Sequence, residues 1–130
     1  MDSSKLRDTQ IIYAPISIGE LADKISILRH KRDLLTGQPR NNATHELHLL
    51  IEIFDSLDSN LIDPSQLRRL QLVNRELWDV ENALRKHEDI ALFDHDLIAL
   101  ARSVYRLNDE RAKIKRLINE ALGSHLIEEK

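Results

Sequence analysis

The chain has 130 residues, of which 42% are hydrophobic and 32% charged, and its formal net charge is −3. This balance is typical of a folded chain rather than a disordered one, and the length fits one domain over residues 1–130. No apolar run approaches the roughly 20 residues that cross a membrane, and a slightly acidic chain lacks the basic footprint of a dedicated nucleic-acid binder.

The sequence contains no cysteine. This excludes disulfides, thiolate metal ligands and a cysteine nucleophile. The first residues, Met1 to Lys5, lack the apolar stretch of a secretion signal. We therefore expect a cytoplasmic protein.

Only three glycines and three prolines interrupt a chain rich in helix-forming residues. We predict an all-α fold, an antiparallel bundle of three to four helices with a long C-terminal helix. Residues 1–10 are polar and are predicted to be a flexible arm, and residues 124–130 a short tail. The apolar segment Ile11–Pro15 is predicted to be an extended arm that packs on the bundle or on a second subunit.

The first predicted helix begins after Ser17, because Ser17 and Glu20 have the spacing of a capping box. We expect it to run from Ile18 to about Thr36. Gly37 fits a left-handed cap at its end, and Pro39 prevents its continuation.

This helix carries apolar residues on two sides. The main stripe consists of five residues: Ile18, Leu21, Ile25, Leu28 and Leu35. Ile27 and Leu34 lie on nearly the opposite side at 100° per residue. A helix with two apolar sides is packed between partners. We therefore expect Ile27 and Leu34 to be buried against another helix, in the same chain or in a second copy.

Two further helices are predicted in the middle of the chain. The second spans Asn42–Leu57, and the linker Asp58–Asp63 follows it. Asp63 then caps a third helix that has Pro64 at its first position, where the missing N–H does no harm. Its apolar residues step by three and four as far as His87, like a coiled-coil seam.

The fourth helix is predicted to begin between Asp89 and Asp94 and to reach Leu122, with Gly123 as its stop. At about 30 residues it is near 45 Å long, whereas the second helix has only about four turns. The mismatch leaves part of the long helices uncovered. We expect dimerisation through the first helix or through the ends of the third and fourth to cover it.

Arg111 stands where the seam of the fourth helix requires an apolar residue. A charge in such a position needs an acidic partner, because an unpaired buried charge is very costly. The candidates are Glu81 on the third helix and Glu20 or Asp23 on the first. One interpretation is a small cationic pocket in which Arg111 grips a carboxylate or phosphate. The alternative, which we favour, is a structural ion pair that fixes the helix register.

Three other polar residues accompany this group. Asn108 and Lys115 lie on the same side of the fourth helix as Arg111, at i−3 and i+4. Lys24 follows Glu20 at i+4, a spacing that favours a solvated ion pair on the first helix.

Two clusters resemble metal ligands but fit other roles better. His45, His48 and Glu52 share one face of the second helix, without the spacing of a zinc-protease helix, so we interpret them as a solvated face. The residues His87–Asp89 and Asp94–Asp96 lack the central glycine of a calcium loop and are interpreted as a helix-capping loop. The sequence therefore predicts no metal site and no cofactor.

The fourth helix also has a basic stretch made of Arg102, Arg106, Lys113 and Arg116. Such stretches are usually solvated. Residues 45–65 contain five acids and no base, and are a predicted partner for it.

Two segments carry a resemblance to a known family. Residues 16–28 read ISIGELADKISIL, and residues 105–119 read YRLNDERAKIKRLIN, continuing to the ending Glu128–Lys130. They contain the motifs GELxDKxxIL and NDxRAxIKxxIN, and with them the chain resembles a family of short uncharacterised bacterial and phage proteins, a domain of unknown function. The resemblance implies no activity, cofactor or substrate. It highlights eight polar or glycine positions: Gly19, Glu20, Asp23, Lys24, Asn108, Asp109, Arg111 and Lys115.

No nucleophile–base pair, phosphate loop or dinucleotide fingerprint occurs in the sequence. We interpret the chain as a non-enzymatic helical protein that forms a homo-oligomer and binds a partner protein or a small anion. The candidate ligand-binding residues are Glu20, Asp23, Lys24, Asn108, Arg111 and Lys115. One alternative is a small helical enzyme or ligand-binding domain that uses this acidic and arginine-containing pocket. Another is weak nucleic-acid contact through Arg102, Arg106 and Arg116.

Overall fold

The computed structural model describes residues 10–124 and residue 129, and within them the secondary structure is entirely helical. The helices are α2 (Ile18–Leu34), α3 (Gly37–Asp55), the short 3₁₀ helix η1 (Ser59–Leu61), α4 (Pro64–Asp89) and α5 (His95–Ala121). The prediction of an all-α fold with a long C-terminal helix is confirmed. The predicted arm over residues 1–10 and the tail over 124–130 fall almost wholly outside the described residues.

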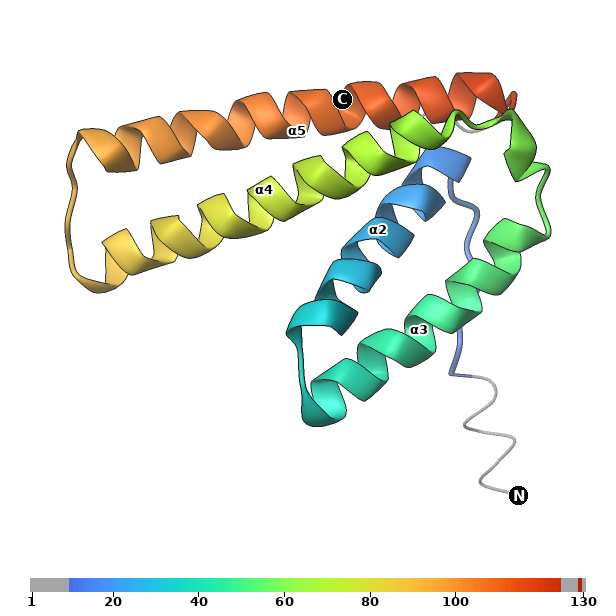
Figure 1. Cartoon of the computed structure of the whole chain (residues 1–130), viewed down its shortest axis with the longest axis horizontal. Helices are drawn as coiled ribbons and strands as arrows, with labels where there is room; N and C mark the ends of the chain where they lie inside the picture. Colours follow the sequence, from blue (N-terminus) through green and yellow to red (C-terminus); the bar gives the residue numbers. More distant parts are fainter. Residues whose placement is uncertain (1–9, 125–128, 130) are drawn as a thin grey trace.

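The four α-helices form two antiparallel hairpins, α2–α3 and α4–α5 (Figure 1). Helix α2 joins them, because it packs against α3 on one side and against α4 and α5 on the other. The α4–α5 hairpin is the longer of the two, and its far half extends beyond α2 and α3 (Figure 1). No helix in the described part of the chain is both long and apolar enough to cross a membrane.

Two apolar clusters hold this arrangement together. One lies between α2, α4 and α5 and is centred on Leu70 and Ile114, both fully buried. The other lies between α2 and α3 and is centred on Leu47, also fully buried. Phe54 of α3 packs against both clusters. The two cores therefore meet at Phe54.

Predicted caps define several helix ends. The Ser17 side chain accepts a hydrogen bond of 3.1 Å from the Glu20 N–H, as expected, while the Glu20 carboxylate binds Lys115. Asp63 accepts a hydrogen bond of 2.9 Å from the Ser65 N–H. Because that bond favours the charged carboxylate, it lowers the pKa of Asp63 below its usual value of 3.8.

The end of α5 is the Schellman arrangement that the glycine predicts. Gly123 has φ +60°, and its N–H donates to the Glu120 carbonyl oxygen at 3.3 Å. The Ser124 N–H donates to the Asn119 carbonyl oxygen at 2.9 Å. These two bonds satisfy carbonyls that the helix leaves without partners.

The predicted boundary between the first two helices is wrong. Helix α2 ends at Leu34, and α3 begins at Gly37 rather than at Asn42. Gly37 does adopt the left-handed conformation, with φ +64°, but it opens α3. Pro39 lies in the first turn of α3, where an N–H has no acceptor within the helix, so the proline does not interrupt it.

The second apolar side of α2 is not covered within the described residues. Leu34 is 50% exposed, and Ile27 is half-buried. The expectation that another helix of this chain buries both is therefore wrong, and burial by a second copy stays a prediction.

Candidate functional site

The predicted polar group assembles where α2 crosses α4 and α5. Asp23 of α2 is completely buried. Its carboxylate accepts hydrogen bonds of 3.0 and 3.1 Å from Arg111 Nε, and Arg111 Nη2 also bonds to Asp23 Oδ2. Of the three candidate partners for Arg111, Asp23 is thus the one that pairs with it. Glu81 is exposed on α4.

A second pair of charges lies one helical turn from the first. Lys115 Nζ is 2.6 Å from Glu20 Oε2 and 3.9 Å from Asp23 Oδ2. Lys24, which is largely exposed, lies 3.9 Å from Glu20 Oε1, as its spacing on α2 predicted. Asn108 is half-buried one turn before Arg111. The structure therefore brings Glu20, Asp23, Arg111 and Lys115 together.

The sequence analysis missed two asparagines that complete this group. Asn74 of α4 donates from Nδ2 to Asp23 Oδ1 at 2.9 Å and to Ser26 Oγ at 3.2 Å. Asn119 of α5 accepts the Gly19 N–H at 2.6 Å. Asn119 had a signal in the sequence, because it closes the second family motif, whereas Asn74 lies beside the unbroken apolar seam of α4 and had none.

Gly19 explains how closely α2 approaches α5. A Cβ atom at this position would overlap the backbone carbonyl oxygen of Lys115. A side chain here would push the helices apart and lengthen the contacts of Glu20 and Asp23. The two motifs therefore meet face to face, with Gly19 setting the distance and the charged residues setting the register.

Opposite charges face each other in this cluster. The carboxylates of Glu20 and Asp23 face Arg111 and Lys115, with the largely exposed Lys24 at the edge. An incoming anion would have to displace the buried Asp23 carboxylate from its bidentate pairing with Arg111. Such a geometry favours the structural ion pair over an anion pocket at Arg111.

Buried polar residues continue along the same side of α2. His30 is 8% exposed, and its ring meets that of Trp78 of α4 edge to face, with centroids 5.3 Å apart. Its Nε2 atom is buried without a hydrogen-bond partner among the described residues. Asp23, Ser26 and His30 thus form a polar row facing α4, which specifies how the two helices align.

The clusters that resembled metal sites lie in solvent or at a helix cap. His45 and His48 are exposed. Asp94 caps α5 by accepting the Leu97 N–H at 3.1 Å, and His87 Nδ1 lies 3.0 Å from the Leu92 carbonyl oxygen, which confirms the capping interpretation of this loop. No three histidine or acidic side chains converge as metal ligands within the described residues.

The basic stretch of α5 does not meet residues 45–65 through Arg116. Arg116 lies 3.6 Å from Glu120 on the next turn and 3.9 Å from Glu129. An ion pair between α4 and α5 joins Arg69 to Glu110, at 2.9 Å. Helix α2 separates most of α3 from α5, which is why these acids and bases do not meet.

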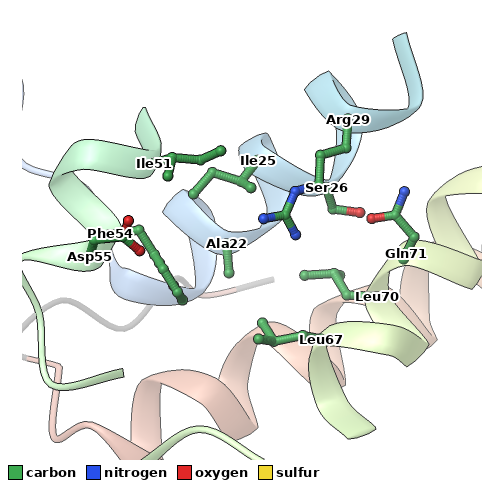
Figure 2. Close-up of a pocket in the computed structure, with 10 residues that line it drawn as sticks. All are labelled: Ala22, Ile25, Ser26, Arg29, Ile51, Phe54, Asp55, Leu67, Leu70 and Gln71. Atoms are coloured by element: carbon green, nitrogen blue, oxygen red, sulfur yellow. The ribbon is translucent and has the colours of Figure 1, made fainter. Parts of the chain in front are cut away.

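A pocket of about 120 Å³ lies between the two apolar cores (Figure 2). Ala22 and Ile25 of α2, Phe54 of α3 and Leu70 of α4 form its apolar lining. Arg29 of α2 and Asp55 of α3 supply the charged groups at its rim. The sequence analysis did not identify this pocket, because its residues come from three helices and share no motif.

Comparison with known proteins agrees with the resemblance of the motifs. The model of a family of unknown function, DUF6165, matches residues 12–130. No curated protein and no solved structure matches the chain. Since the match covers both motifs and the pairing between them, the chain belongs to the family of unknown function DUF6165.

Proposed function

We propose that the protein is a cytoplasmic homodimer in which the far half of the α4–α5 hairpin pairs with the same region of a second copy. The observation that carries this proposal is the burial pattern: not one residue from 78 to 113 is buried. The apolar residues that face the partner helix there, among them Val80, Leu84, Leu100 and Val104, are all half-buried. Two helices alone leave such a seam open, and a second hairpin closes it into a four-helix bundle.

The side of α5 that faces away from α4 supports pairing with another helix. Ile98 is 57% exposed and Tyr105 is 73% exposed. They are seven residues apart, so they share one face, and Ala101 lies between them on that face. A small residue between two large ones allows a second helix to approach closely.

Charge supports a second copy as the partner, in antiparallel orientation. Residues 87–101 contain four acids and no lysine or arginine, whereas residues 102–107 contain Arg102 and Arg106 and no acid. In a two-fold arrangement centred on Ala101, the acidic segment of one copy lies level with the basic segment of the other, and the symmetry produces this juxtaposition twice.

The test is the molar mass of the protein in solution, measured by sedimentation equilibrium on the wild type and on Tyr105→Glu. We expect a wild-type dimer at tens of micromolar, a range that also detects weak association. Tyr105→Glu should be a folded monomer, because the residue is largely exposed within one chain. Tyr13→Glu is the matched control, since Tyr13 is 79% exposed on the N-terminal segment.

Three results would overturn the proposal. The first is a wild-type monomer at these concentrations. The second is a dimer that survives Tyr105→Glu but is lost in Tyr13→Glu, which would place the interface at the N-terminal segment, residues 11–16. The third is a dimer lost only in Leu34→Glu, which would place it on the second apolar side of α2.

A further inference from the structure

We infer that the pocket between α2, α3 and α4 binds a small monocarboxylate with a short apolar body, a site independent of the proposed dimer interface. Residues of α2, α3 and α4 line the pocket, and none of residues 78–113 does. Its apolar lining is made of residues from both cores, including the buried Ala22 and Leu70. Phe54, which packs against both cores, leaves this volume open between them.

The cation of this site is Arg29. Figure 2 shows its side chain running back along α2, so that the guanidinium lies among the lining side chains, between Ile25 and Leu70 in this view. Among the described residues Arg29 forms no ion pair, in contrast to Arg111 and Lys115, which are paired with carboxylates. A guanidinium above an apolar floor matches a carboxylate attached to a hydrocarbon, because its planar fork binds both carboxylate oxygens.

The opposite rim limits the charge of the ligand. Asp55 of α3 lies across the pocket from Arg29, on the far side of the Phe54 ring (Figure 2). A second negative charge on the ligand would face this carboxylate and be repelled. The site therefore favours a monocarboxylate over a dicarboxylate or a phosphate ester with an anionic tail.

The volume limits the size of the ligand. A volume of about 120 Å³ holds a small organic molecule but not a large one. A branched acid with four or five carbons fills this space with its hydrocarbon end and leaves the carboxylate at the rim. Isovalerate has this shape and serves as the probe.

The experiment is a titration of the ¹⁵N-labelled full chain with sodium isovalerate, followed by amide chemical shifts. We expect saturable shifts at residues 22–29 of α2, 51–55 of α3 and 67–71 of α4. Isopentanol, which has the same carbon skeleton without the carboxylate, should bind at least ten-fold more weakly, as should succinate. Arg29→Gln should also raise the isovalerate Kd about ten-fold or more, since it removes charge-assisted hydrogen bonds.

Arg32→Gln is the matched control, because Arg32 lies on the same helix, pairs with the neighbouring Asp33 and does not line the pocket. It should leave the isovalerate Kd unchanged. Ile51→Phe, which adds volume to the pocket from α3, should abolish binding while Arg29 is retained. The spectra of each variant show at once whether it is folded.

Three results would overturn the inference. One is the absence of saturable shifts at these residues up to roughly 50 mM isovalerate, well above a millimolar Kd. Another is equal binding of isopentanol and isovalerate, which would leave the guanidinium without a role. The third is an equal loss of affinity in Arg29→Gln and Arg32→Gln. Such a result would mean that isovalerate responds to the net charge of the chain and not to Arg29 in the pocket.

Discussion

The two halves of the α4–α5 hairpin differ in what surrounds them. In the half next to α2, Leu70, Val73 and Leu77 of α4 and Ile114 and Ile118 of α5 are buried. In the far half, the same alternation of apolar residues by three and four continues, but none of these residues is buried. The difference arises mainly from α2, which supplies the third side of the near half, with Ile62 and Phe54 packing beside it. An apolar repeat of three and four residues is enough for two helices to pair. A third or fourth helix is needed to bury the seam between them.

The near half also contains the paired charged residues Asp23 and Arg111. Because Asp23 is buried, this pair specifies how α2 aligns with α5. Asp23 meets Arg111 and Asn74 at a point where any shift of α2 along α5 by one turn would leave a buried carboxylate without donors. Apolar contacts tolerate such a shift far better. The polar cluster therefore fixes which turn of α2 faces which turn of α5, while the apolar cores supply most of the stability.

Removal of one partner from the buried pair should give the largest effect. We expect Asp23→Ala to lower the free energy of unfolding by about 3 kcal/mol, since it leaves the Arg111 cation without its carboxylate. The value lies at the low end for a buried pair because the Arg111 side chain remains 28% exposed. Urea denaturation of the two proteins measures the difference.

The double substitution Asp23→Leu with Arg111→Met separates charge from packing. If the pair serves register rather than stability, the double variant should lose much less than Asp23→Ala, because no charge remains unpaired. A loss in the double variant as large as the sum of the two single ones would contradict this interpretation and assign the pair a net stabilising role.

A side chain at Gly19 should have the next largest effect. We expect Gly19→Ala to cost about 1–3 kcal/mol, the range for overpacking, because its Cβ meets backbone of α5 that has little room to move. Without that clash, alanine would stabilise a helix by roughly 1 kcal/mol relative to glycine. Thermal unfolding shows whether Gly19→Ala is less or more stable than the wild type. A more stable variant would show that α2 and α5 leave room for a Cβ atom at residue 19.

The smallest effect is expected at the tip of the far half. Ala91 has φ +52°, and its N–H donates to the Glu88 carbonyl oxygen at 3.1 Å, in a cap that glycine would form without strain. Ala91→Gly should therefore raise the free energy of unfolding by up to about 1 kcal/mol. Ala99→Gly, at an exposed position within α5, is the control and should lower it by about 1 kcal/mol.

The helices and the pairing of the two motifs were largely predictable from the sequence. Ser17, Asp63 and Gly123 mark helix ends by local hydrogen bonds, which act over a few residues and so leave a local signature. Arg111 in an apolar seam required an acid, but the sequence left Glu20, Asp23 and Glu81 as candidates, and only the structure identifies Asp23. What local rules missed was the start of α3, because Pro39 is compatible both with the end of one helix and with the first turn of the next.

The remaining features depend on contacts between helices that no local pattern encodes. Asn74 is chemically unremarkable on a helix and gains its role only because α2 places Asp23 and Ser26 opposite it. The pocket below Arg29 arises where three helices diverge, and its size depends on crossing angles rather than on any one segment. The far half of the hairpin is likewise exposed because α2 does not extend along it. This is visible only in the assembled fold.

Oxidative cross-linking of single cysteines tests the proposed antiparallel dimer most directly, because the natural chain contains no cysteine. Ala101→Cys places a thiol at the proposed two-fold axis, and Ala91→Cys places one at the hairpin tip. We predict a covalent dimer for Ala101→Cys, whose Cβ atoms should approach to about 4 Å, and a monomer for Ala91→Cys under the same oxidant. A cross-link through residue 91 and none through residue 101, or no cross-link from either, would contradict it.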